Sequence, residues 1–550
     1  MDQGLSYLKG PTDVPLRPIT VGGFVEELKD EFEDVIIISS IEQKKTLTTQ
    51  EFFEETDNFA AALYDSGLKR GDKIGIIVNN SVEALVANYG CIKGGFVLVN
   101  LNPALQPREL EYYMKTLQIS CIVCVDKYKS FNILDTIKKI VPELGESSSE
   151  VVDSKSVPSL KLVIVISDEQ YRGTTKFKSI MSLGKSIPKE TLTNFKNQID
   201  THDIFTILFT SGSTGNPKMV GLTHHQFANC LNVLKMRLPL LQEKGNFCFY
   251  LPLFHIFGLG FCLLCISHGV TITLPSLYYN PEKNLRAISN EGCTWIMGTP
   301  TMLADLIRIQ KDLNLPLSPT IAISGGAAGS TQLFKDVLEI LKIKQLRSGY
   351  GMSETAAAVW PVAEDFNDFK SVGTLCDHLE AKIVDNEGTI VPIGTVGELY
   401  LRGYSIIKNY LNYDTELLDQ DGWFKTGDAV YVDKNGKIYI TGRLKDIINR
   451  GGEKISPAEV EELLQSYPNI VEVYVVGTYH ERLGEEVCAC IKLTSGTTVT
   501  LEEVKNYCKG KLSYYKIPTR IEIMDSFPKT LIGKIQKSKL TELVNNVVVN

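Results

Sequence analysis

The chain has 550 residues, of which 43% are hydrophobic and 22% are charged, and it carries a formal net charge of -8 at pH 7. This composition is typical of a globular protein, and the length predicts about two to four domains. The negative charge argues against a nucleic-acid binder, because binding a polyanion needs clustered basic surface. Small molecules are therefore the expected partners.

The longest uncharged apolar run, Ile256 to Ile266, is much shorter than the roughly 20 residues that cross a bilayer. No membrane-spanning helix is expected. The N-terminal stretch contains Asp2, Asp13 and Glu26 and has no apolar core of a signal peptide. This pattern argues against a secretory signal and against an Arg-rich transit peptide, so the sequence predicts a cytoplasmic location.

The chain contains 12 cysteines, which could bind a metal. Two pairs have the spacing C-x-x-C, namely Cys121/Cys124 and Cys262/Cys265. Both pairs lie in apolar runs without a histidine cluster nearby, which is typical of buried reduced thiols. We therefore assign no metal to them.

Helical and strand patterns alternate from about residue 20 to 126. Helices are expected over residues 50–66, 82–92 and 108–117, and strands over residues 73–78, 96–99 and 121–125. Such alternation builds a parallel sheet covered by helices. The alternation resumes further along and continues to about residue 350, so the parallel-sheet architecture is expected to extend that far.

The pattern changes between about residues 371 and 441. Short strand patterns are interrupted there by the turn sequences Asn-Glu-Gly (386–388) and Lys-Asn-Gly (434–436), which predict a β-rich region of hairpins. Beyond Gly442, residues 456–459 and 500–503 have the pattern of capping boxes, and strands are expected over residues 471–476, 487–493 and 521–524.

We therefore predict an α/β fold with two domains. Residues 1–442 would form a large N-terminal domain of helix-covered parallel sheets with a β-rich subdomain. Residues 443–550 would form a small separate α+β domain.

A glycine-rich stretch, Ser-Gly-Ser-Thr-Gly-Asn-Pro-Lys, spans residues 211–218. Its spacing matches neither a Walker loop nor the G-x-G-x-x-G of a dinucleotide fold. Glycines let the backbone approach a ligand, hydroxyl groups and amides donate to phosphate oxygens, and a lysine neutralises charge. Taken alone, the stretch fits either a phosphate loop or a flexible surface loop.

Six further motifs follow this stretch along the chain. They are LPLFHIFG (251–258), SGGAA (324–328), GYGMSET (349–355), WFKTGD (423–428), GRLKDIINRGGEKISPAEVE (442–461) and PKTLIGKIQK (528–537). With these motifs the chain resembles the adenylate-forming superfamily, which includes acyl-CoA synthetases, peptide-synthetase adenylation domains and firefly-type luciferases. The segments GEEVCACIKL (484–493) and CKGKLSYYKIP (508–518) are similar to medium-chain acyl-CoA synthetases of the acyl-CoA synthetase family member 2 type. Some of those proteins are mitochondrial, which makes a mitochondrial location the alternative.

The resemblance implies an ATP- and Mg2+-dependent ligase that joins a carboxylic acid to coenzyme A. The acid would react with ATP to give an acyl-AMP and pyrophosphate, and the thiol would then displace AMP. A medium-chain fatty acid is the expected substrate. The alternative is a luciferase-type oxidoreductase, since the shared adenylation motifs would look the same, and a non-catalytic nucleotide-binding protein is a third, less favoured class.

By resemblance, one group of residues would bind the β- and γ-phosphates of ATP: Thr210, Ser211, Gly212, Ser213, Thr214, Gly215 and Lys218. Glu354 would hold Mg2+, which prefers carboxylate and phosphate oxygens. The alternative for Glu354 is a glutamate favoured at a helix N-terminus. Thr355 would lie near the α-phosphate.

The remaining nucleotide contacts come from three motifs. Gly325, Gly326 and Tyr350 would lie against adenine, with Gly349 and Gly351 as further contacts in the same motif. A carboxylate can accept hydrogen bonds from two hydroxyl groups, so Asp428 would bind the ribose, with a plain turn aspartate as the alternative. Arg443 would be the second ribose contact.

The resemblance also implies residues that act on the acyl group and on the domain arrangement. Lys534 would bridge the α-phosphate and the substrate carboxylate, and His255 would lie at the carboxylate end of the acyl pocket, with core packing as the alternative. Lys445 and Asp446 would form the hinge for a rotation of the small domain. In the rotated arrangement Gly451 and Gly452 would replace Lys534 and let coenzyme A pass close to the backbone.

Overall fold

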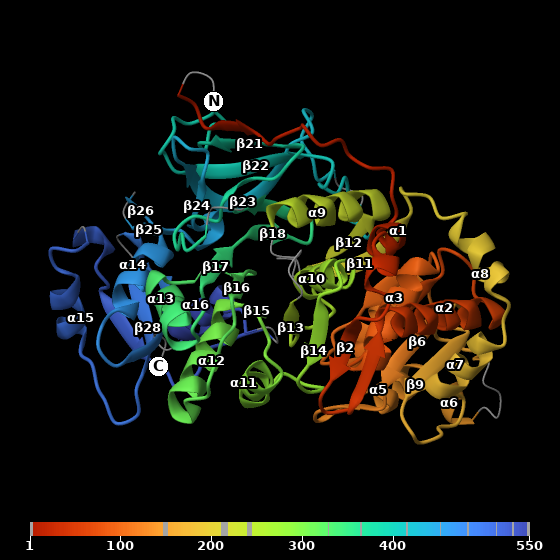
Figure 1. The fold of residues 1–550 in the computed structure, drawn as a ribbon. Coiled ribbons are helices and arrows are strands. Elements are labelled where there is room, and N and C mark those ends of the chain that lie inside the picture. Colours follow the sequence, from red (N-terminus) through yellow and green to blue (C-terminus); the bar gives the residue numbers. More distant parts are fainter. Residues whose placement is uncertain are drawn as a thin grey trace.

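The computed structural model describes residues 4–146, 152–210, 218–238, 245–327, 329–362, 366–413, 416–450, 453–480, 483–512, 514–530 and 533–546. Two seven-stranded sheets, a β-rich sheet and a C-terminal α+β unit make up this part of the chain (Figure 1). The α/β class predicted from the alternation of patterns is confirmed.

The first seven-stranded sheet has the strand order β10-β9-β6-β4-β5-β11-β12. Its strands are β4 (Lys73–Ile77), β5 (Val97–Asn100), β6 (Ile119–Val125), β9 (Leu162–Ile166), β10 (Thr175–Lys176), β11 (Ile204–Thr210) and β12 (Lys218–Thr223). All neighbouring strands are parallel except β11 and β12, which form an antiparallel pair. That pair ends on either side of the glycine-rich stretch.

Helices cover both faces of this sheet. They include α1 (Val21–Glu26), α2 (Thr49–Asp65), α3 (Val82–Lys93), α4 (Pro107–Leu117), α5 (Ile133–Ile140), α6 (Glu143–Glu146), α7 (Phe177–Lys185) and α8 (Lys189–Lys196). Along β6, Cys121 and Val123 pack into the core with α2 and α3, whereas Ile122 and Cys124 pack into a second core with α4 and α5. Successive strand residues point to opposite faces, which explains why β6 is apolar throughout. The helices and strands expected between residues 50 and 125 are confirmed.

The second seven-stranded sheet has the order β17-β16-β15-β13-β14-β2-β3. It contains β2 (Ile36–Ser40), β3 (Lys45–Thr48), β13 (Asn246–Cys248), β14 (Thr271–Leu274), β15 (Trp295–Gly298), β16 (Ile321–Ser324) and β17 (Gln345–Ser348). Only the pair β2–β3 is antiparallel. The associated helices are α9 (His224–Arg237), α10 (Ile256–Ile266), α11 (Pro281–Asn290), α12 (Pro300–Leu313) and α13 (Thr331–Ile340).

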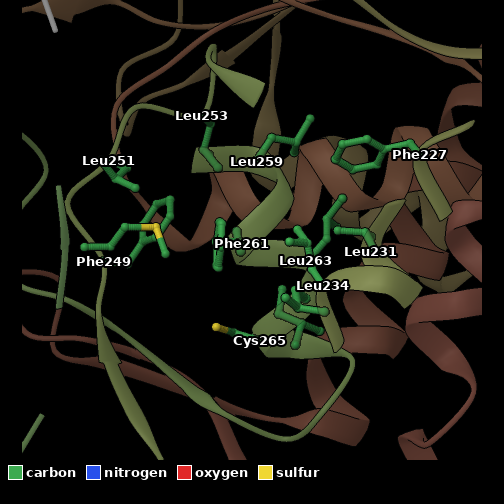
Figure 2. Close-up of a cluster of buried hydrophobic side chains, with 14 of the residues drawn as sticks. Phe227, Leu231, Leu234, Phe249, Leu251, Leu253, Leu259, Phe261, Leu263 and Cys265 are labelled. Atoms are coloured by element: carbon green, nitrogen blue, oxygen red, sulfur yellow. The ribbon is translucent and has the colours of Figure 1, made fainter. Parts of the chain in front are cut away.

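The apolar run Ile256 to Ile266 forms helix α10 inside the core. Its side chains Leu259 and Leu263 lie toward Phe227 and Leu231 of α9 (Figure 2). A helix that is apolar on all sides suits such a buried position. Within the described ranges, no helix is long and apolar enough to cross a membrane.

The β-rich region forms an antiparallel sheet of β21 (Leu379–Val384), β22 (Gly397–Gly403), β23 (Phe424–Val432) and β24 (Ile438–Arg443). Turns lie at both predicted positions, and Gly388 and Gly436 have φ values of 83° and 79°, which favour glycine. The β-rich expectation is confirmed. The edge strand β1 (Tyr7–Lys9) was not anticipated, because it pairs with a strand far away in sequence.

The C-terminal unit contains β25 (Ile448–Arg450), β26 (Glu453–Ile455), β27 (Ile470–His480), β28 (Gly484–Leu493) and β29 (Arg520–Ile523), with α14 (Pro457–Gln465), α15 (Leu501–Cys508) and α16 (Lys537–Asn546). Thr500 and Glu503 form the predicted capping box of α15. The capping box predicted at Ser456 is wrong. The Ser456 hydroxyl donates instead to the carbonyl of Thr441 across the segment that joins the two regions.

The hydrophobic core is divided near the predicted hinge. Core clusters of the C-terminal unit contain only residues from Ile448 onward, whereas the other clusters reach no further than Ile440. The connecting segment includes a 3-10 turn, Leu444–Asp446, with an exposed Lys445. This division favours the domains 1–442 and 443–550, which remain a prediction.

All 12 cysteines are buried and free. The described residues contain no cluster of His, Cys, Asp and Glu that could hold a metal ion. The expected burial of the two C-x-x-C pairs is confirmed.

Candidate active site

The candidate site lies at the carboxyl ends of parallel strands in the second sheet. Gly298 of β15, Ser324 of β16 and Ser348 of β17 are in register, so these three strands end at the same edge. The chain continues from them into Thr299, the pair Gly325–Gly326 and the pair Gly349–Tyr350, respectively. Ligands of open α/β sheets bind in the crevice outside such strand ends. The topology therefore brings two of the sequence motifs, SGGAA and GYGMSET, to one edge together with Thr299.

Glycines at this edge leave no room for a side chain. A Cβ atom on Gly325 would lie 3.0 Å from the Phe257 ring, and one on Gly349 would lie 2.1 Å from Trp360. Gly326 has a φ of 79° and therefore lies in the left-handed region. Glycine at positions 325 and 349 therefore lets the rings of Phe257 and Trp360 pack directly against the backbone of the segments after β16 and β17.

Asp428 is a buried carboxylate with both oxygens engaged. The Tyr350 hydroxyl donates to Asp428 Oδ2 at 2.6 Å, and Arg443 Nε lies 3.0 Å from Oδ1. Asp428 and Arg443 are register partners on β23 and β24. Burial, followed by the charge of Asp428, raises the pKa of Tyr350, so its hydroxyl remains a donor at neutral pH. The structure thus joins the strand end of the second sheet to the β-rich sheet.

Glu354 lies in the turn between β18 (Tyr350–Met352) and β19 (Ala356–Trp360). It is 8% exposed, and its Oε1 accepts from Tyr410 at 3.0 Å and from Thr210 Oγ1 at 3.5 Å. Lys218 Nζ lies 4.6 Å from the centre of the Tyr410 ring. Thr210 and Lys218 are paired residues at the end of the β11–β12 pair that adjoins the glycine-rich stretch. Four polar groups from distant segments therefore meet beside the glycine-rich stretch.

Thr355 is completely buried next to Glu354. Its hydroxyl accepts from the Met352 backbone N–H at 3.3 Å, and the following residue, Ala356, has a φ of 52°. Such a backbone conformation is costly for a residue other than glycine and is concentrated at functional sites. The turn is thus held in one fixed shape.

Lys534 belongs to the C-terminal unit but faces this same site. Burial is the main cause that lowers its pKa, and the charges of Arg443 and Lys445 lower it further, while those of Asp428 and Asp446 raise it. His255, the residue before α10, has its pKa lowered to about 4 by burial and then by the charge of Lys534. His255 is therefore neutral at pH 7, and Lys534 interacts electrostatically with both Asp428 and His255.

A tight turn holds Lys534. The Lys534 carbonyl accepts from Thr530 N–H at 2.7 Å, and the Lys534 N–H donates to Thr530 Oγ1 at 3.1 Å. Gly533 has a φ of 78°, and its carbonyl accepts from Thr301 Oγ1 at 3.0 Å. The turn thus touches helix α12 of the large region.

Several predicted site residues lie outside the described residues. They are Ser211, Gly212, Ser213, Thr214, Gly215, Gly451 and Gly452. Conversely, Tyr410 and Thr301 were missed by the sequence analysis. Tyr410 lies outside the six motifs, and Thr301 follows Pro300 at a helix start, where its role depends on a partner more than 200 residues away.

The arrangement of these elements is shared with solved structures of adenylate-forming enzymes. The anthranilate CoA ligase AuaEII in complex with anthranoyl-AMP superposes with a TM-score of 0.85 at 23% identity, covering 98% of this chain and 99% of that one. A benzoate CoA ligase from Burkholderia xenovorans gives a TM-score of 0.78 at 21% identity, covering 95% and 100%. At this identity the likeness defines the fold, which is that of an adenylate-forming enzyme.

The sequence itself defines the family. Residues 25–411 match the AMP-binding enzyme family, and residues 459–534 match the AMP-binding enzyme C-terminal domain, so the chain belongs to the AMP-binding enzymes. It is 37% identical to the mitochondrial medium-chain acyl-CoA ligase ACSF2 of Danio rerio, with 98% of this chain and 90% of that protein covered. It is also 32% identical to the putative acyl-CoA synthetase YngI of Bacillus subtilis, with 95% and 96% covered. The resemblance drawn from the motifs is confirmed.

Proposed function

We propose that the protein is an AMP-forming acyl-CoA ligase that activates a medium-chain fatty acid. The observation that carries the proposal is the contact of the segment before Lys534 with helix α12 of the large region, through the bond from Thr301 to the Gly533 carbonyl. Lys534 also interacts electrostatically with Asp428 and His255 of that region. A positively charged side chain near the strand ends that would bind the nucleotide suits a reaction between two anions, the carboxylate of the acid and the phosphate of ATP. The curated relatives, which are named as acyl-CoA ligases, support the same activity.

In the first half-reaction, a carboxylate oxygen of the acid attacks the α-phosphorus of ATP. The new P–O bond gives the acyl-AMP, and the bond to the β-phosphate breaks to release pyrophosphate. Lys534 would bind the carboxylate and an α-phosphate oxygen together, which offsets their repulsion and aligns them. An ammonium group on a flexible stem can follow both oxygens as they move.

The nucleotide would be bound by the edge of the second sheet and by the β-rich sheet. Gly325, Gly326 and Tyr350 would lie against adenine, while Asp428 and Arg443 would bind the ribose. Two existing hydrogen-bond partners fix the orientation of the Asp428 carboxylate before a nucleotide enters. Its remaining lone pairs can accept from ribose hydroxyl groups.

Thr210, Lys218 and Thr355 would contact the phosphates together with the glycine-rich stretch, and Glu354 would hold Mg2+. A buried carboxylate beside a hydroxyl group supplies the hard oxygen ligands that this ion prefers. The ion, when bound, would neutralise phosphate charge. Tyr410 would keep the Glu354 carboxylate oriented through its hydrogen bond.

In the second half-reaction, the thiolate of coenzyme A attacks the acyl carbon, and the bond to AMP breaks. The C-terminal unit would rotate about Lys445 and Asp446, and Lys534 would leave the site. Gly451 and Gly452 would then lie near the adenylate. A large residue in place of Gly452 is expected to slow this step and to spare the first.

A pyrophosphate-release screen tests the function. The purified chain would receive ATP, Mg2+ and one carboxylic acid at a time, with and without coenzyme A. Medium-chain fatty acids should give pyrophosphate in both conditions and an acyl-CoA only when coenzyme A is present. An apolar pocket separates neighbouring chain lengths by only about 1 to 3 kcal/mol per methylene, so a range of lengths should react. Absence of acyl-AMP from every acid would refute the proposal.

Substitution of the lysine tests the mechanism. Lys534→Ala should slow acyl-AMP formation by roughly 100-fold or more, since one preorganised electrostatic group supplies about that factor. Thioester formation from supplied acyl-AMP should persist in this variant. Equal loss in both half-reactions would contradict the role given to Lys534.

The relatives do not favour the luciferase alternative, because those compared are named as ligases. Light emission from a luciferin, together with no thioester, would nevertheless support it. The cytoplasmic location stays a prediction from the sequence. The names of the ACSF2 relatives support the mitochondrial alternative, and fractionation of cells that make the tagged chain distinguishes the two.

A further inference from the structure

Helix α12 is the part of the large region that touches the turn of Lys534. In Figure 1 this helix lies beside the blue C-terminal elements. Thr301 is the second residue of α12, and its Oγ1 donates to the carbonyl of Gly533 at 3.0 Å. The bonded carbonyl belongs to the residue directly before Lys534.

Internal hydrogen bonds fix Thr530, Gly533 and Lys534 relative to one another, but they do not place these residues against the large region. Gly533 N–H donates to the Thr530 carbonyl at 2.8 Å, and the two bonds between Thr530 and Lys534 close the turn. None of these bonds relates the turn to the large region. The bond from Thr301 does, because it reaches from α12 into the turn itself.

The contact between Thr301 and Gly533 is also a close packing contact. A Cβ atom on Gly533 would lie 3.1 Å from the methyl group of Thr301 and 3.2 Å from its Cβ. The side chain of Thr301 therefore fits directly against the bare backbone of the turn. Thr301 thus contacts Gly533 both by packing and through a hydrogen bond.

Other contacts cross the same boundary without touching the turn. Thr331, the first residue of α13, donates from its hydroxyl to Glu462 Oε1 of α14 at 2.7 Å. Asp305 lies one helical turn after Thr301 and interacts electrostatically with Lys529. These contacts link the C-terminal unit to the large region away from the turn. Thr301, by contrast, contacts Gly533, directly before Lys534.

We propose that Thr301 is a positioning residue for adenylate formation, which holds the Lys534 turn in place through the Gly533 carbonyl and releases it when the C-terminal unit rotates. This inference rests on the proposed function. The proposed rotation would carry Gly533 away from Thr301 and break the bond, so the bond would stabilise the first half-reaction and not the second. Its loss shifts the population of arrangements away from adenylate formation.

The experiment compares Thr301→Val, Thr301→Ser and the matched control Thr331→Val in separate half-reactions. Adenylate formation is followed as pyrophosphate release without coenzyme A, and thioester formation is followed from supplied acyl-AMP. Thr301→Val keeps the shape and removes the donor, so adenylate formation should fall about 3- to 10-fold, the range that one hydrogen bond supplies. The KM for the acid and the rate of thioester formation should stay within about twofold.

The two other variants separate positioning from general docking. Thr301→Ser keeps the hydroxyl and should retain most of the rate of adenylate formation, and Thr331→Val should change that rate less than about twofold. An equal effect of Thr301→Val and Thr331→Val would overturn the inference in favour of general docking. No effect of Thr301→Val, or equal loss in both half-reactions, would also overturn it. Failure of the unsubstituted chain to form acyl-AMP would instead refute the proposed function.

Discussion

At the scale of single residues, the site depends on two groups of opposite charge, the buried Asp428 carboxylate and the Lys534 ammonium group. Asp428 is 4% exposed and keeps two donors, while Lys534 faces it from the other side of the domain boundary. A buried charged group interacts strongly with neighbouring charges, but burial also favours the uncharged form of the group. The ionisation of Lys534 is therefore expected to limit the reaction on the alkaline side.

The rate of acyl-AMP formation should fall as pH rises through the pKa of Lys534. Burial favours the neutral amine and lowers this pKa, so the fall should begin below the ordinary lysine pKa of about 10.4. Initial rates of pyrophosphate release measured from pH 7 upward test this. The control is Lys534→Arg, since a guanidinium group stays charged throughout. An unchanged alkaline fall in that variant would assign it to another group.

At the scale of secondary-structure elements, one hairpin shapes the candidate site, and a buried ion network joins helices of the large region. The hairpin β18–β19 presents Glu354 and Thr355, and its backbone packs so tightly that a Cβ atom on Gly351 would lie 1.9 Å from the carbonyl oxygen of Ala356. Backbone atoms cannot rotate away as a side chain can. The shape of this hairpin therefore requires glycine at position 351.

Gly351→Ala should slow adenylate formation by roughly 100-fold, because a displacement of about 1 Å in positioning groups has that effect. Pyrophosphate release measures it. Gly388→Ala is the matched control, since that glycine has a φ of 83° in a different hairpin with open space around it. The control should lose about 1 to 2 kcal/mol of stability through its backbone conformation while turnover is kept. Similar turnover in the two variants would contradict the argument.

A buried ion network joins four helices of the large region. Lys93 of α3 is 3% exposed, and it contacts Asp57 of α2 at 2.8 Å and Glu26 of α1. Lys196 of α8 reaches the same two carboxylates at 2.8 Å and 3.7 Å. Burial lowers the pKa of Lys93, and the two carboxylates oppose this effect. The network is stable only while its charges are balanced.

Lys93→Met should therefore destabilise the large region by about 3 kcal/mol or more, because two carboxylates keep their buried positions with less positive charge. The midpoint of thermal unfolding measures the loss. Lys196→Met should have a smaller effect, since Lys196 lies nearer the solvent, with 26% of its side chain exposed. A larger loss from Lys196→Met would show that Lys93 is not the central charge.

At the scale of the whole molecule, the site is divided between two bodies that have separate cores. The side chains of Ile455, Val475 and Ile491 pack together within the C-terminal unit and share no core cluster with the large region. The contacts across the boundary include isolated hydrogen bonds such as those from Thr301 and Thr331. The rotation proposed for the second half-reaction would break these bonds.

Residues 443–550 expressed alone should fold, because a unit with its own core can be independently stable. Thermal unfolding followed by circular dichroism should show a cooperative transition, and the fragment should be inactive. Residues 1–442 alone should still bind ATP, since the predicted adenine and ribose contacts up to Asp428 belong to them. A fragment 443–550 without a cooperative transition would contradict the predicted domain boundary.

Much of the fold and part of the site could be predicted from the sequence. Apolar spacing predicted α2, α3 and three strands of the first sheet, β4, β5 and β6, because local burial patterns follow the helix and strand periods. The motifs predicted Glu354, Asp428 and Lys534 as site residues, although their roles remain untested. Ser456 shows the limit of such patterns: its capping sequence is present, yet its hydroxyl bonds to Thr441 instead.

The sequence by itself determined the family, the order of the motifs and the types of side chain available for chemistry. Only the tertiary structure decided that Tyr410 orients Glu354, that Tyr350 and Arg443 share Asp428, and that Thr301 holds the turn of Lys534. Apart from the Arg443–Asp428 pair, which lies on two neighbouring strands, these contacts join segments more than 50 residues apart along the chain. Local pattern carries no information about such pairs, because the packing of whole sheets and domains brings them together.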